Sequence, residues 1–576
     1  MKVTCQVVTT PTVDSPGSAL ILGLESKRYL FGNVSEGIQR ALLQRKIRTA
    51  RIGDFFLTGK TEWKSVGGLL GMMLTLADQE TARKTDFENK RTETIARNET
   101  IQVYGKGTMG TVQENFEKKV LNVHGGENLL HTLGTTRAFV FRTSMRTNVQ
   151  EIEADYKDEH LRCHPIKVFP EGYVPGEVDE KEDLEALVIN RGGGGGPAGL
   201  GAGARKRSFD GELKKPLTKQ QVLQSVVSDM FNSSWTMDTM VDAEIPGDDP
   251  ADPNGAGNGS GVLPKQVRAP WPASHVQSLP RSRPSQASLS YYVTLHPQRG
   301  RFLPNIAKAL GVKPGPEFRK LTNGESVTTA EGKIVKPEEC MEPQKPGKHI
   351  LVLDIPDVTY IQPLLSREEL QEENLEATIF WLLGDGVSAD TRVWTKIRKW
   401  GNATVRYIPT PLPPPPSSIT NISTYQHVLS SPDLCPNTIT IQGAAKAATR
   451  LALLHPDHFP IPRHNNTPAQ LLPSDIPNLL LARPSQEISI LPKFDVRQIQ
   501  IPMTHPDGSF DFDAARKDIR PEYLRLAEEA RETVIREERE EGLEELPGKD
   551  VEIITLGTGS AMPSKYRNGN ILPPPP

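Results

Sequence analysis

Short apolar runs alternate with polar, glycine-containing turns in the first part of the chain. Four such runs lie at 2–10, 18–24, 27–33 and 50–59. Each run has the length and the β-branched or aromatic content that is typical of a strand. An apolar stretch with helical spacing follows at 67–78 and is bounded by glycines. Strands that alternate with helical segments predict a layered α/β domain.

The pattern weakens between residues 146 and 288. Residues 191–208 are rich in glycine and have almost nothing to bury, so we predict a flexible linker there. Residues 218–235 place apolar side chains at helical spacing, which predicts a short amphipathic helix within this region. Two roles remain open for that helix: it packs on its own domain, or it docks a partner.

Ordered patterns return after residue 288. Strand-like runs lie at 288–296, 349–355 and 377–386, and a helical run lies at 392–400. A highly charged helix is predicted over 520–546, with apolar residues along one side. Charge runs of this kind are usually solvated. A connecting helix is therefore favoured over a partner-binding one.

The composition limits the possible classes of protein. The 576 residues include 49 prolines and 47 glycines, and the hydrophobic fraction is 36%, so exposed segments are expected beside packed domains. The net charge of −3 excludes an overall basic nucleic-acid-binding protein, so an anionic partner has to meet a local patch. The 4 cysteines form no CxxC pair, which indicates reduced thiols in an intracellular protein and excludes a zinc ribbon. We find neither a membrane-spanning stretch nor a secretory signal pattern.

One segment is locally basic. Its six basic side chains, set against the single acid Glu317, are Arg299, Arg301, Lys308, Lys313, Arg319 and Lys320. The rigid KPGPEF stretch would hold these charges in a fixed protrusion. Phosphates would neutralise such a patch and make binding dependent on salt. On charge alone, a solvated basic loop is the alternative.

Candidate metal ligands elsewhere are weak. His455, His458 and His464 lie in HPDHFPIPRH, where prolines break any helix that would bring them onto one face, so we interpret them as loop histidines. Asp354 and Asp357 lie at a strand end, where a carboxylate can bridge metal ions. Without histidine partners, a role in the turn is favoured for both. No Walker GxxxxGK[ST] motif occurs, which argues against a nucleotide site.

Several stretches together resemble the long form of tRNase Z, the endonuclease that removes the 3′ trailer from precursor tRNA. They are YLFGNVSEGIQR, FFLTGKTEW and GGLLGMMLTLAD near the N-terminus, the region around Gly315 and Pro316, and TLGTGSAMPSKYRN at 555–568. The NVSEGIQR stretch and the inserted arm are most similar to fungal long forms. The resemblance implies an α/β fold of the αββα metallo-β-lactamase type, with a protruding flexible arm and disordered insertions.

In that family only the C-terminal of two similar halves keeps its metal ligands, a His-x-His-x-Asp-His cluster for two zinc ions in a strand-to-helix turn. The corresponding turn here is TGKTEWKSVGG, which puts Gly59, Thr61, Trp63 and Lys64 at the ligand positions. Glycine, tryptophan and protonated lysine supply no zinc ligand, and threonine is a poor one. We therefore expect no metal and no catalytic residue in this chain, whereas zinc belongs to the intact family protein.

The resemblance also implies roles for two sets of residues. The first set would form the exosite that clamps the tRNA: Arg299, Arg301, Lys308, Lys313, Gly315, Pro316, Arg319 and Lys320. The second set matches the signature that opens the family's catalytic half: Gly557, Thr558, Gly559, Ser560, Pro563, Lys565, Tyr566, Arg567 and Asn568. The chain ends at Pro576. We therefore expect that the catalytic half is truncated just after its start.

The expected organisation has six segments. They are the first part of the N-terminal domain (1–145), a largely disordered insertion (146–288), the basic arm and hairpin (289–345), the remainder of the domain (346–512), a linker helix (513–550) and the truncated start of the catalytic domain (551–576).

The expected function is that of the substrate-binding half of a tRNA 3′-processing endonuclease, inactive by itself. Its partners would be precursor tRNA and the missing catalytic half, in the nucleus, the mitochondrion or both, with no membrane or DNA partner. The alternatives are a non-catalytic RNA-binding or regulatory module, an incomplete gene model, and a scaffold unrelated to RNA.

Overall fold

The computed structural model describes most of the chain up to residue 540. The described ranges are 2–104, 108–113, 115–142, 144–174, 218–233, 235, 240–245, 263–268, 278–297, 300–329, 332–342, 347–371, 377–401, 425–453, 459–461, 463–468, 471–476, 478–517 and 519–540. Several stretches and residues named above lie outside these ranges: the glycine-rich segment 191–208, Arg299, His455, His458 and the signature at 557–568.

The first of two large sheets has eight strands in the order β19-β18-β1-β2-β3-β4-β5-β6. Its strands are β1 (Val3–Thr9), β2 (Ala19–Gly23), β3 (Arg28–Gly32), β4 (Ile52–Leu57), β5 (Val120–Gly125), β6 (Arg146–Glu151), β18 (Gln486–Leu491) and β19 (Asp495–Gln498). Strands β3 to β6 run parallel to one another, and the other neighbours pair antiparallel. The four strands predicted near the N-terminus are confirmed as β1 to β4.

The second sheet has seven strands in the order β17-β16-β15-β14-β11-β8-β7. Its strands are β7 (Tyr156–Lys157), β8 (Leu161–Val168), β11 (Ser288–Leu295), β14 (His349–Ile355), β15 (Ala377–Leu383), β16 (Tyr425–Ser430) and β17 (Leu479–Leu481). The strands predicted at 288–296, 349–355 and 377–386 are confirmed. Strand β15 is apolar at nearly every position because both faces of the sheet are covered.

The two sheets pack face to face around an aromatic core. Phe31 and Phe56 of the first sheet stack with ring centroids 4.8 Å apart. Tyr291 of the second sheet meets Phe56 edge-on at 5.4 Å, and all three rings are buried. Aromatic pairs in these geometries add about 0.5–1.5 kcal/mol each beyond their buried area. This cluster is therefore the interior between the two sheets.

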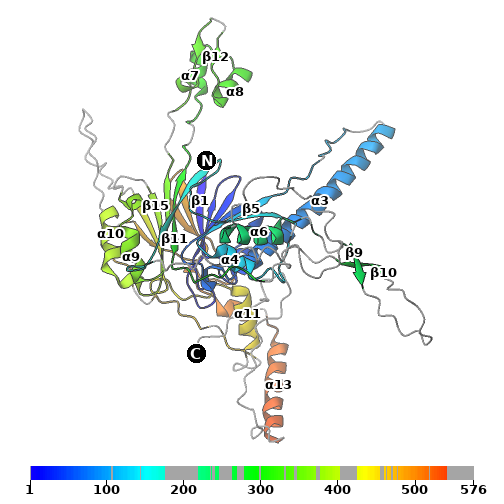
Figure 1. Cartoon of the computed structure of the whole chain (residues 1–576). Coiled ribbons are helices and arrows are strands. Elements are labelled where there is room, and N and C mark those ends of the chain that lie inside the picture. Colours follow the sequence, from blue (N-terminus) through cyan, green and yellow to red (C-terminus); the bar gives the residue numbers. More distant parts are fainter. Residues whose placement is uncertain are drawn as a thin grey trace, which may run out of the picture.

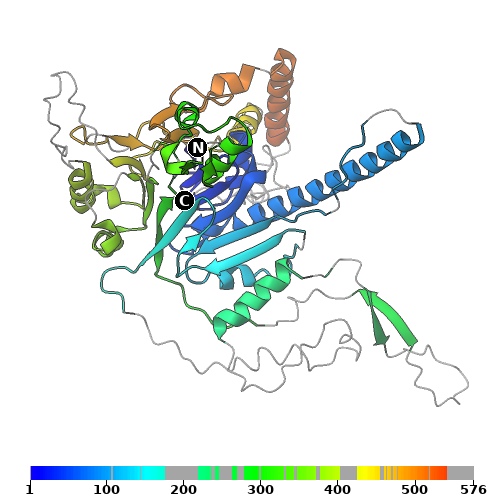
Figure 2. The same cartoon turned by 90° about the horizontal axis from the view of Figure 1, so that it is seen from above.

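Helices form the two outer layers (Figures 1 and 2). The first sheet is covered by α1 (Ile38–Gln44), α3 (Leu69–Tyr104), α4 (Leu129–Gly134) and α6 (Lys219–Phe231), whose buried apolar residues share one core with it. The second sheet is covered by α9 (Ile361–Leu365) and α10 (Thr391–Gly401). The helix predicted at 392–400 is confirmed as α10. The molecule thus has the αββα layering that the resemblance implied.

Helix α3 is much longer than the predicted helix at 67–78. It has 36 residues, and its second half leaves the body of the protein (Figure 2). That half is charged rather than amphipathic, and it contains the ion pairs Lys84–Glu88 (3.5 Å) and Lys90–Asp86 (2.7 Å), both four residues apart. Such pairs stabilise an exposed helix without an apolar face, so the hydrophobic pattern gave no signal for this part.

Part of the segment 146–288 is ordered, against the expectation of a largely disordered insertion. Residues 146–168 contain β6, β7 and β8. Strands β6 and β7 lie at the edges of their sheets, and β6 buries only alternate residues, so its sequence is polar and its strand signal is weak. The predicted amphipathic helix is confirmed as α6. Its apolar face joins the core of the first sheet, so it packs on its own domain.

The remaining elements lie outside the two sheets. They are α2 (Trp63–Val66), the hairpin β9 (Met240–Ile245) and β10 (Leu263–Arg268), α7 (Pro304–Ala309), α8 (Pro316–Asn323), β12 (Val327–Thr328), β13 (Ile334–Val335), α11 (Gln442–Leu451), α12 (Phe512–Lys517), α13 (Pro521–Glu540) and the short 3₁₀ turns η1 (Thr49–Arg51), η3 (Pro337–Glu339), η4 (Val358–Tyr360), η5 (Glu368–Leu370) and η6 (Val387–Ala389). The charged helix predicted from residue 520 is confirmed as α13. In the described part of the chain, every helix lacks the length or the apolar character that crossing a bilayer requires.

Candidate nucleic-acid interface

The basic segment folds into a small unit between β11 and β14, which stands away from the sheets (Figure 1). We call residues 300–342 the arm. Its core consists of six buried residues: Ala307, Val312, Leu321, Val327, Val335 and Cys340. Phe302 and Phe318 pack edge-on beside this core, with ring centroids 5.1 Å apart. Because the arm has its own core, it presents its surface residues in a defined arrangement.

Backbone contacts close the base of the arm. The Leu303 N–H donates to the Cys340 carbonyl at 2.8 Å, and the Glu342 N–H donates to the Arg301 carbonyl at 2.9 Å. The segments that enter and leave the arm are therefore paired. The expected arm, 289–345, also includes β11, which belongs to the second sheet.

The Gly315–Pro316 step sets the shape of the arm. Gly315 has φ 121° and ψ −129°, a conformation that is essentially restricted to glycine. A Cβ at this position would meet no atom within 4 Å, so the requirement is conformational rather than steric packing. Pro316 is the first residue of α8, where its missing N–H costs nothing. The Glu317 carboxylate accepts a hydrogen bond from the Lys313 N–H at 2.9 Å, which braces the turn.

The structure places five of the six predicted basic residues on the arm, and all five are exposed. They are Arg301, Lys308, Lys313, Arg319 and Lys320. Within the described ranges none of the five forms an ion pair, although other exposed cations of the body have acidic partners, such as Arg398 with Asp475 at 2.8 Å. The arm therefore offers positive charge that is open to an external anion.

A second feature is the turn that corresponds to the metal-binding turn of the family. It follows β4 and is tied to the second sheet, because the Gly59 N–H donates to the Leu289 carbonyl at 2.9 Å and the Leu289 N–H donates back at 3.1 Å. Gly59 has φ 71°. Trp63 is 60% exposed, and the Lys64 ammonium lies 3.8 Å from the Glu62 carboxylate. None of these groups is arranged as a metal ligand.

Asp354 lies against this turn, which could not be foreseen from the sequence. Its carboxylate accepts a hydrogen bond of 2.6 Å from the Thr58 hydroxyl, and a Cβ on Gly59 would come within 3.0 Å of its oxygens. Burial raises the pKa of Asp354 to about 7, although the Thr58 hydrogen bond opposes the shift. Asp354 is therefore a buried partner of the turn, not a simple turn residue. Asp357 does have the predicted turn role, since it accepts from the Thr359 N–H at 2.9 Å.

The residues around the turn do not fit a zinc pair. They supply two carboxylates, of which only Asp354 is buried, serine hydroxyls and the lysines Lys60 and Lys64, with no imidazole or thiolate. Throughout the described ranges, no three His, Cys, Asp or Glu side chains are grouped as metal ligands. His464, the described member of the predicted histidine trio, packs on Phe512 with ring centroids 4.8 Å apart.

The arm and the turn lie at opposite ends of the same strands. Strands β11 and β14 are antiparallel, and the turn meets them at Leu289 and Asp354. The arm is inserted at their other end, between Leu295 and His349. At about 3.3 Å per residue, the strand length separates the two features by about 20 Å.

The fold defined by these layers is that of a metallo-β-lactamase-like protein. A family model described as tRNase Z endonuclease matches residues 6–68. Ribonuclease Z of Saccharomyces cerevisiae is 24% identical over 97% of this chain and 57% of its own length. The zinc phosphodiesterase ELAC protein 2 of Macaca fascicularis is 24% identical over 98% of this chain and 53% of its own length.

The solved structure of a long-form RNase Z from yeast superposes with a TM-score of 0.56 at 18% identity, over 99% of this chain and 58% of that one. The chain is thus a homologue of long-form ribonuclease Z along nearly its whole length. It spans little more than half the length of the relatives that it matches.

Proposed function

We propose that this chain is the substrate-binding part of a tRNA 3′-processing endonuclease and that the arm grips precursor tRNA. The homology to ribonuclease Z supports the substrate class. The observation that carries the proposal is a preformed arm on which the five predicted cations that the structure describes are exposed, and none of them forms an ion pair within the described residues. Phosphate contacts of this kind position an RNA without reading its sequence.

The proposed division of labour follows from the chemistry of the two features. The turn at Gly59 to Lys64 has no set of zinc ligands, so we derive no hydrolytic step there. The arm supplies binding energy about 20 Å away along the strands. Cleavage is assigned to a catalytic half of the intact enzyme, which the family resemblance places after the matched region and in which zinc would activate water. By the same resemblance we expect the protein in the nucleus, the mitochondrion or both.

A salt-dependent binding experiment tests the arm. The 576-residue chain is titrated with a precursor tRNA at several salt concentrations. The variant Lys313→Glu/Arg319→Glu/Lys320→Glu is expected to bind at least about tenfold more weakly, and its log–log salt slope should fall by about one for each phosphate that it no longer neutralises.

The matched control reverses three exposed cations outside the arm, Arg91, Arg97 and Lys118. It changes the net charge equally, so it separates the arm from the overall field of the protein. If the two variants lose the same affinity, the arm is not the binding site. If neither loses affinity, the alternative of a scaffold unrelated to RNA is favoured.

A second assay distinguishes the alternative of a non-catalytic RNA-binding module. The chain is incubated with precursor tRNA and zinc, first alone and then with a separately produced catalytic half of a relative. Binding without cleavage in the first case, and cleavage that depends on the arm in the second, is the expected result. Cleavage by the chain alone would contradict the assignment of chemistry to another part of the enzyme.

A further inference from the structure

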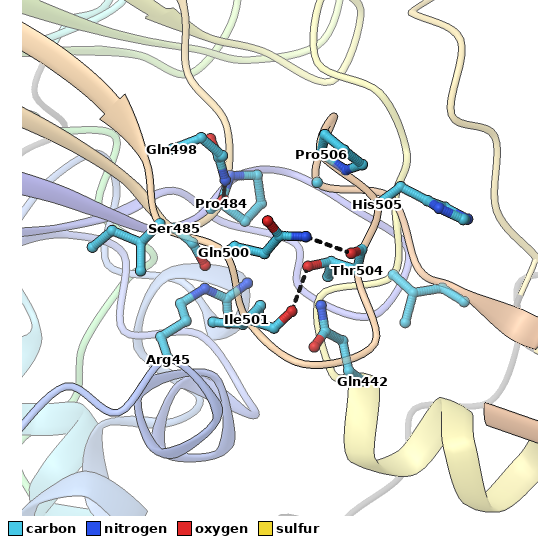
Figure 3. A pocket seen from close by; sticks show the side chains of 13 residues that line it. Arg45, Gln442, Pro484, Ser485, Gln498, Gln500, Ile501, Thr504, His505 and Pro506 are labelled. Carbon is cyan, nitrogen blue, oxygen red and sulfur yellow. Dashed lines mark hydrogen bonds between the residues drawn. The ribbon is translucent and has the colours of Figure 1, made fainter. Parts of the chain in front are cut away.

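A cavity of about 200 Å³, with polar and apolar lining residues, shares no lining residue with the arm or the turn (Figure 3). Its walls come from the C-terminal end of α1, Ile439 and the start of α11, the two residues before β18, and residues 498–508, which begin at the end of β19. Arg45 and His505 are its titratable lining residues, and no Asp or Glu is among the described residues that line it. Its lining is therefore neutral or basic throughout.

Arg45 is a buried cation that has no counter-ion within the described part of the chain. Its side chain caps the end of α1, where Nη1 donates to the Ala41 carbonyl at 3.0 Å. The residue is 4% exposed, and none of the described residues forms a hydrogen bond with its Nε. No ion pair between Arg45 and a carboxylate is found among the described residues. An unpaired buried charge costs several kcal/mol, so this arrangement calls for an anion beside the guanidinium.

The Asp14 carboxylate does not serve as the counter-ion of Arg45. Burial lowers the pKa of Arg45 to about 10, and the Asp14 carboxylate opposes this shift only in part, so the guanidinium stays charged at neutral pH. Asp14 itself accepts hydrogen bonds from the backbone N–H groups of Thr440 (3.1 Å) and Ile441 (2.7 Å). Its oxygens are therefore engaged elsewhere.

Ser485 adds a second unsatisfied group to the same cavity. Its Oγ is buried and has no hydrogen-bond partner among the residues that the structure describes, and the residue is 1% exposed. Its backbone has φ 68°, which costs a non-glycine residue about 1–2 kcal/mol. Backbone strain together with an unpartnered hydroxyl is a combination that is found at ligand sites.

The rest of the wall is held in place without a ligand. The Gln498 amide donates to the Pro484 carbonyl at 2.7 Å, and the Thr504 hydroxyl donates to the Ile501 carbonyl at 2.7 Å. The Gln500 amide donates to the Thr504 carbonyl at 3.4 Å, a contact that Figure 3 draws as a dashed line. The cavity is thus preformed, and ligand binding would require little reorganisation.

We propose that this cavity binds a phosphate-sized oxyanion, with the Arg45 guanidinium and the Ser485 hydroxyl as its principal hydrogen-bond donors. The volume accommodates the ion together with a few waters at about 30 Å³ each. Charge-assisted hydrogen bonds from a guanidinium are among the strongest that a protein offers to such an ion. The proposal is independent of RNA binding by the arm.

The experiment measures binding of inorganic phosphate to the full chain by equilibrium dialysis, with chloride added to hold the ionic strength constant. The expected result is saturable binding of one phosphate per chain. Arg45→Met should weaken binding at least about tenfold, because a charged donor is lost. Ser485→Gly should weaken it by about threefold, because a neutral donor is lost.

Arg40→Met is the matched control. Arg40 belongs to the same helix, is 3% exposed and also has an unpaired Nε, but it does not line the cavity. The Arg40→Met variant should bind phosphate as tightly as the wild type does. Arg45→Met removes an unpaired buried charge, so it should unfold at an equal or higher temperature in phosphate-free buffer. If Arg45→Met does not fold, the comparison of Ser485→Gly with Arg40→Met decides whether the cavity binds phosphate.

Methyl phosphate and dimethyl phosphate identify the source of the anion. Binding of methyl phosphate as tight as that of inorganic phosphate indicates the end of a phosphomonoester, and weaker binding indicates the free ion. Either result supports the proposal. No saturable binding of phosphate or methyl phosphate, a preference for dimethyl phosphate, or wild-type binding by both Arg45→Met and Ser485→Gly would overturn it.

Discussion

Replacing Asp354 by Asn tests the packing of the turn against the second sheet. In the wild type, burial raises the pKa of this carboxyl group from the ordinary 3.8 to about 7. The Thr58 hydroxyl can donate equally well to an amide oxygen, so the variant keeps the 2.6 Å hydrogen bond and loses only the charge. The effect of the substitution therefore isolates the cost of the buried charge.

The magnitude follows from linkage. Below pH 3.8 the carboxyl group is protonated in both the folded and the unfolded state, so it has no effect on stability. As the pH rises, the unfolded state loses its proton first, and the wild type is destabilised until about pH 7, where the folded state ionises as well. At 1.36 kcal/mol per pH unit, the full difference is about 4 kcal/mol. Asp354→Asn should thus become more stable than the wild type as the pH increases.

Urea denaturation between pH 4 and pH 8.5 measures this difference. The gap between the unfolding free energies of variant and wild type should grow with pH up to about 7 and then level off. Asp357→Asn removes a nearby carboxylate that caps an exposed turn, so it serves as the control. A gap that does not change with pH would refute the idea that Asp354 is buried against the turn.

Three further predictions concern other parts of the molecule. Gly315→Ala imposes about 1–3 kcal/mol of backbone strain on the arm; a several-fold loss of precursor-tRNA affinity with an unchanged circular dichroism spectrum is expected, and unchanged affinity would contradict the role of this turn. Lys27→Met leaves the fully buried Asp54 side chain without its 2.7 Å ion pair, which should cost about 3–5 kcal/mol in urea denaturation; a cost below about 1 kcal/mol would count against the pair. Thr218→Ala removes the capping box of α6 and should cost about 1 kcal/mol, whereas Thr218→Ser should restore the wild-type midpoint.

Most central elements could be predicted from the sequence because their signals are local. Strands β1 to β4, β11, β14 and β15 are apolar runs between turn residues, and α6 and α10 show helical spacing. The second half of α3 and the strands β5 to β8 and β16 to β19 were missed. Of these, the second half of α3 and the polar edge strands β6, β7 and β19 bury little apolar surface, so their sequences resemble those of exposed loops.

Some properties of the candidate site could be predicted from the sequence, and others could not. The absence of zinc ligands at Gly59, Thr61, Trp63 and Lys64 could be predicted from residue types alone. The basic character of the arm could be predicted too, because charge is a property of the residues. Whether the cations of the arm stand free or pair with acids could not be predicted, since this depends on which side chains the fold brings within reach.

The sequence by itself determined the ligand chemistry of the turn, the positive charge of the basic segment and the strands β1 to β4, β11, β14 and β15. Only the tertiary structure decided that Asp354 meets Thr58, that the arm and the turn lie at opposite ends of β11 and β14, and that Arg45 and Ser485 share a cavity. Each of these pairs is distant in the chain, and the packing of the sheets and of the elements around them brings it together. Burial then changes what the groups can do, because a carboxylate or guanidinium removed from water needs a partner that the sequence does not reveal.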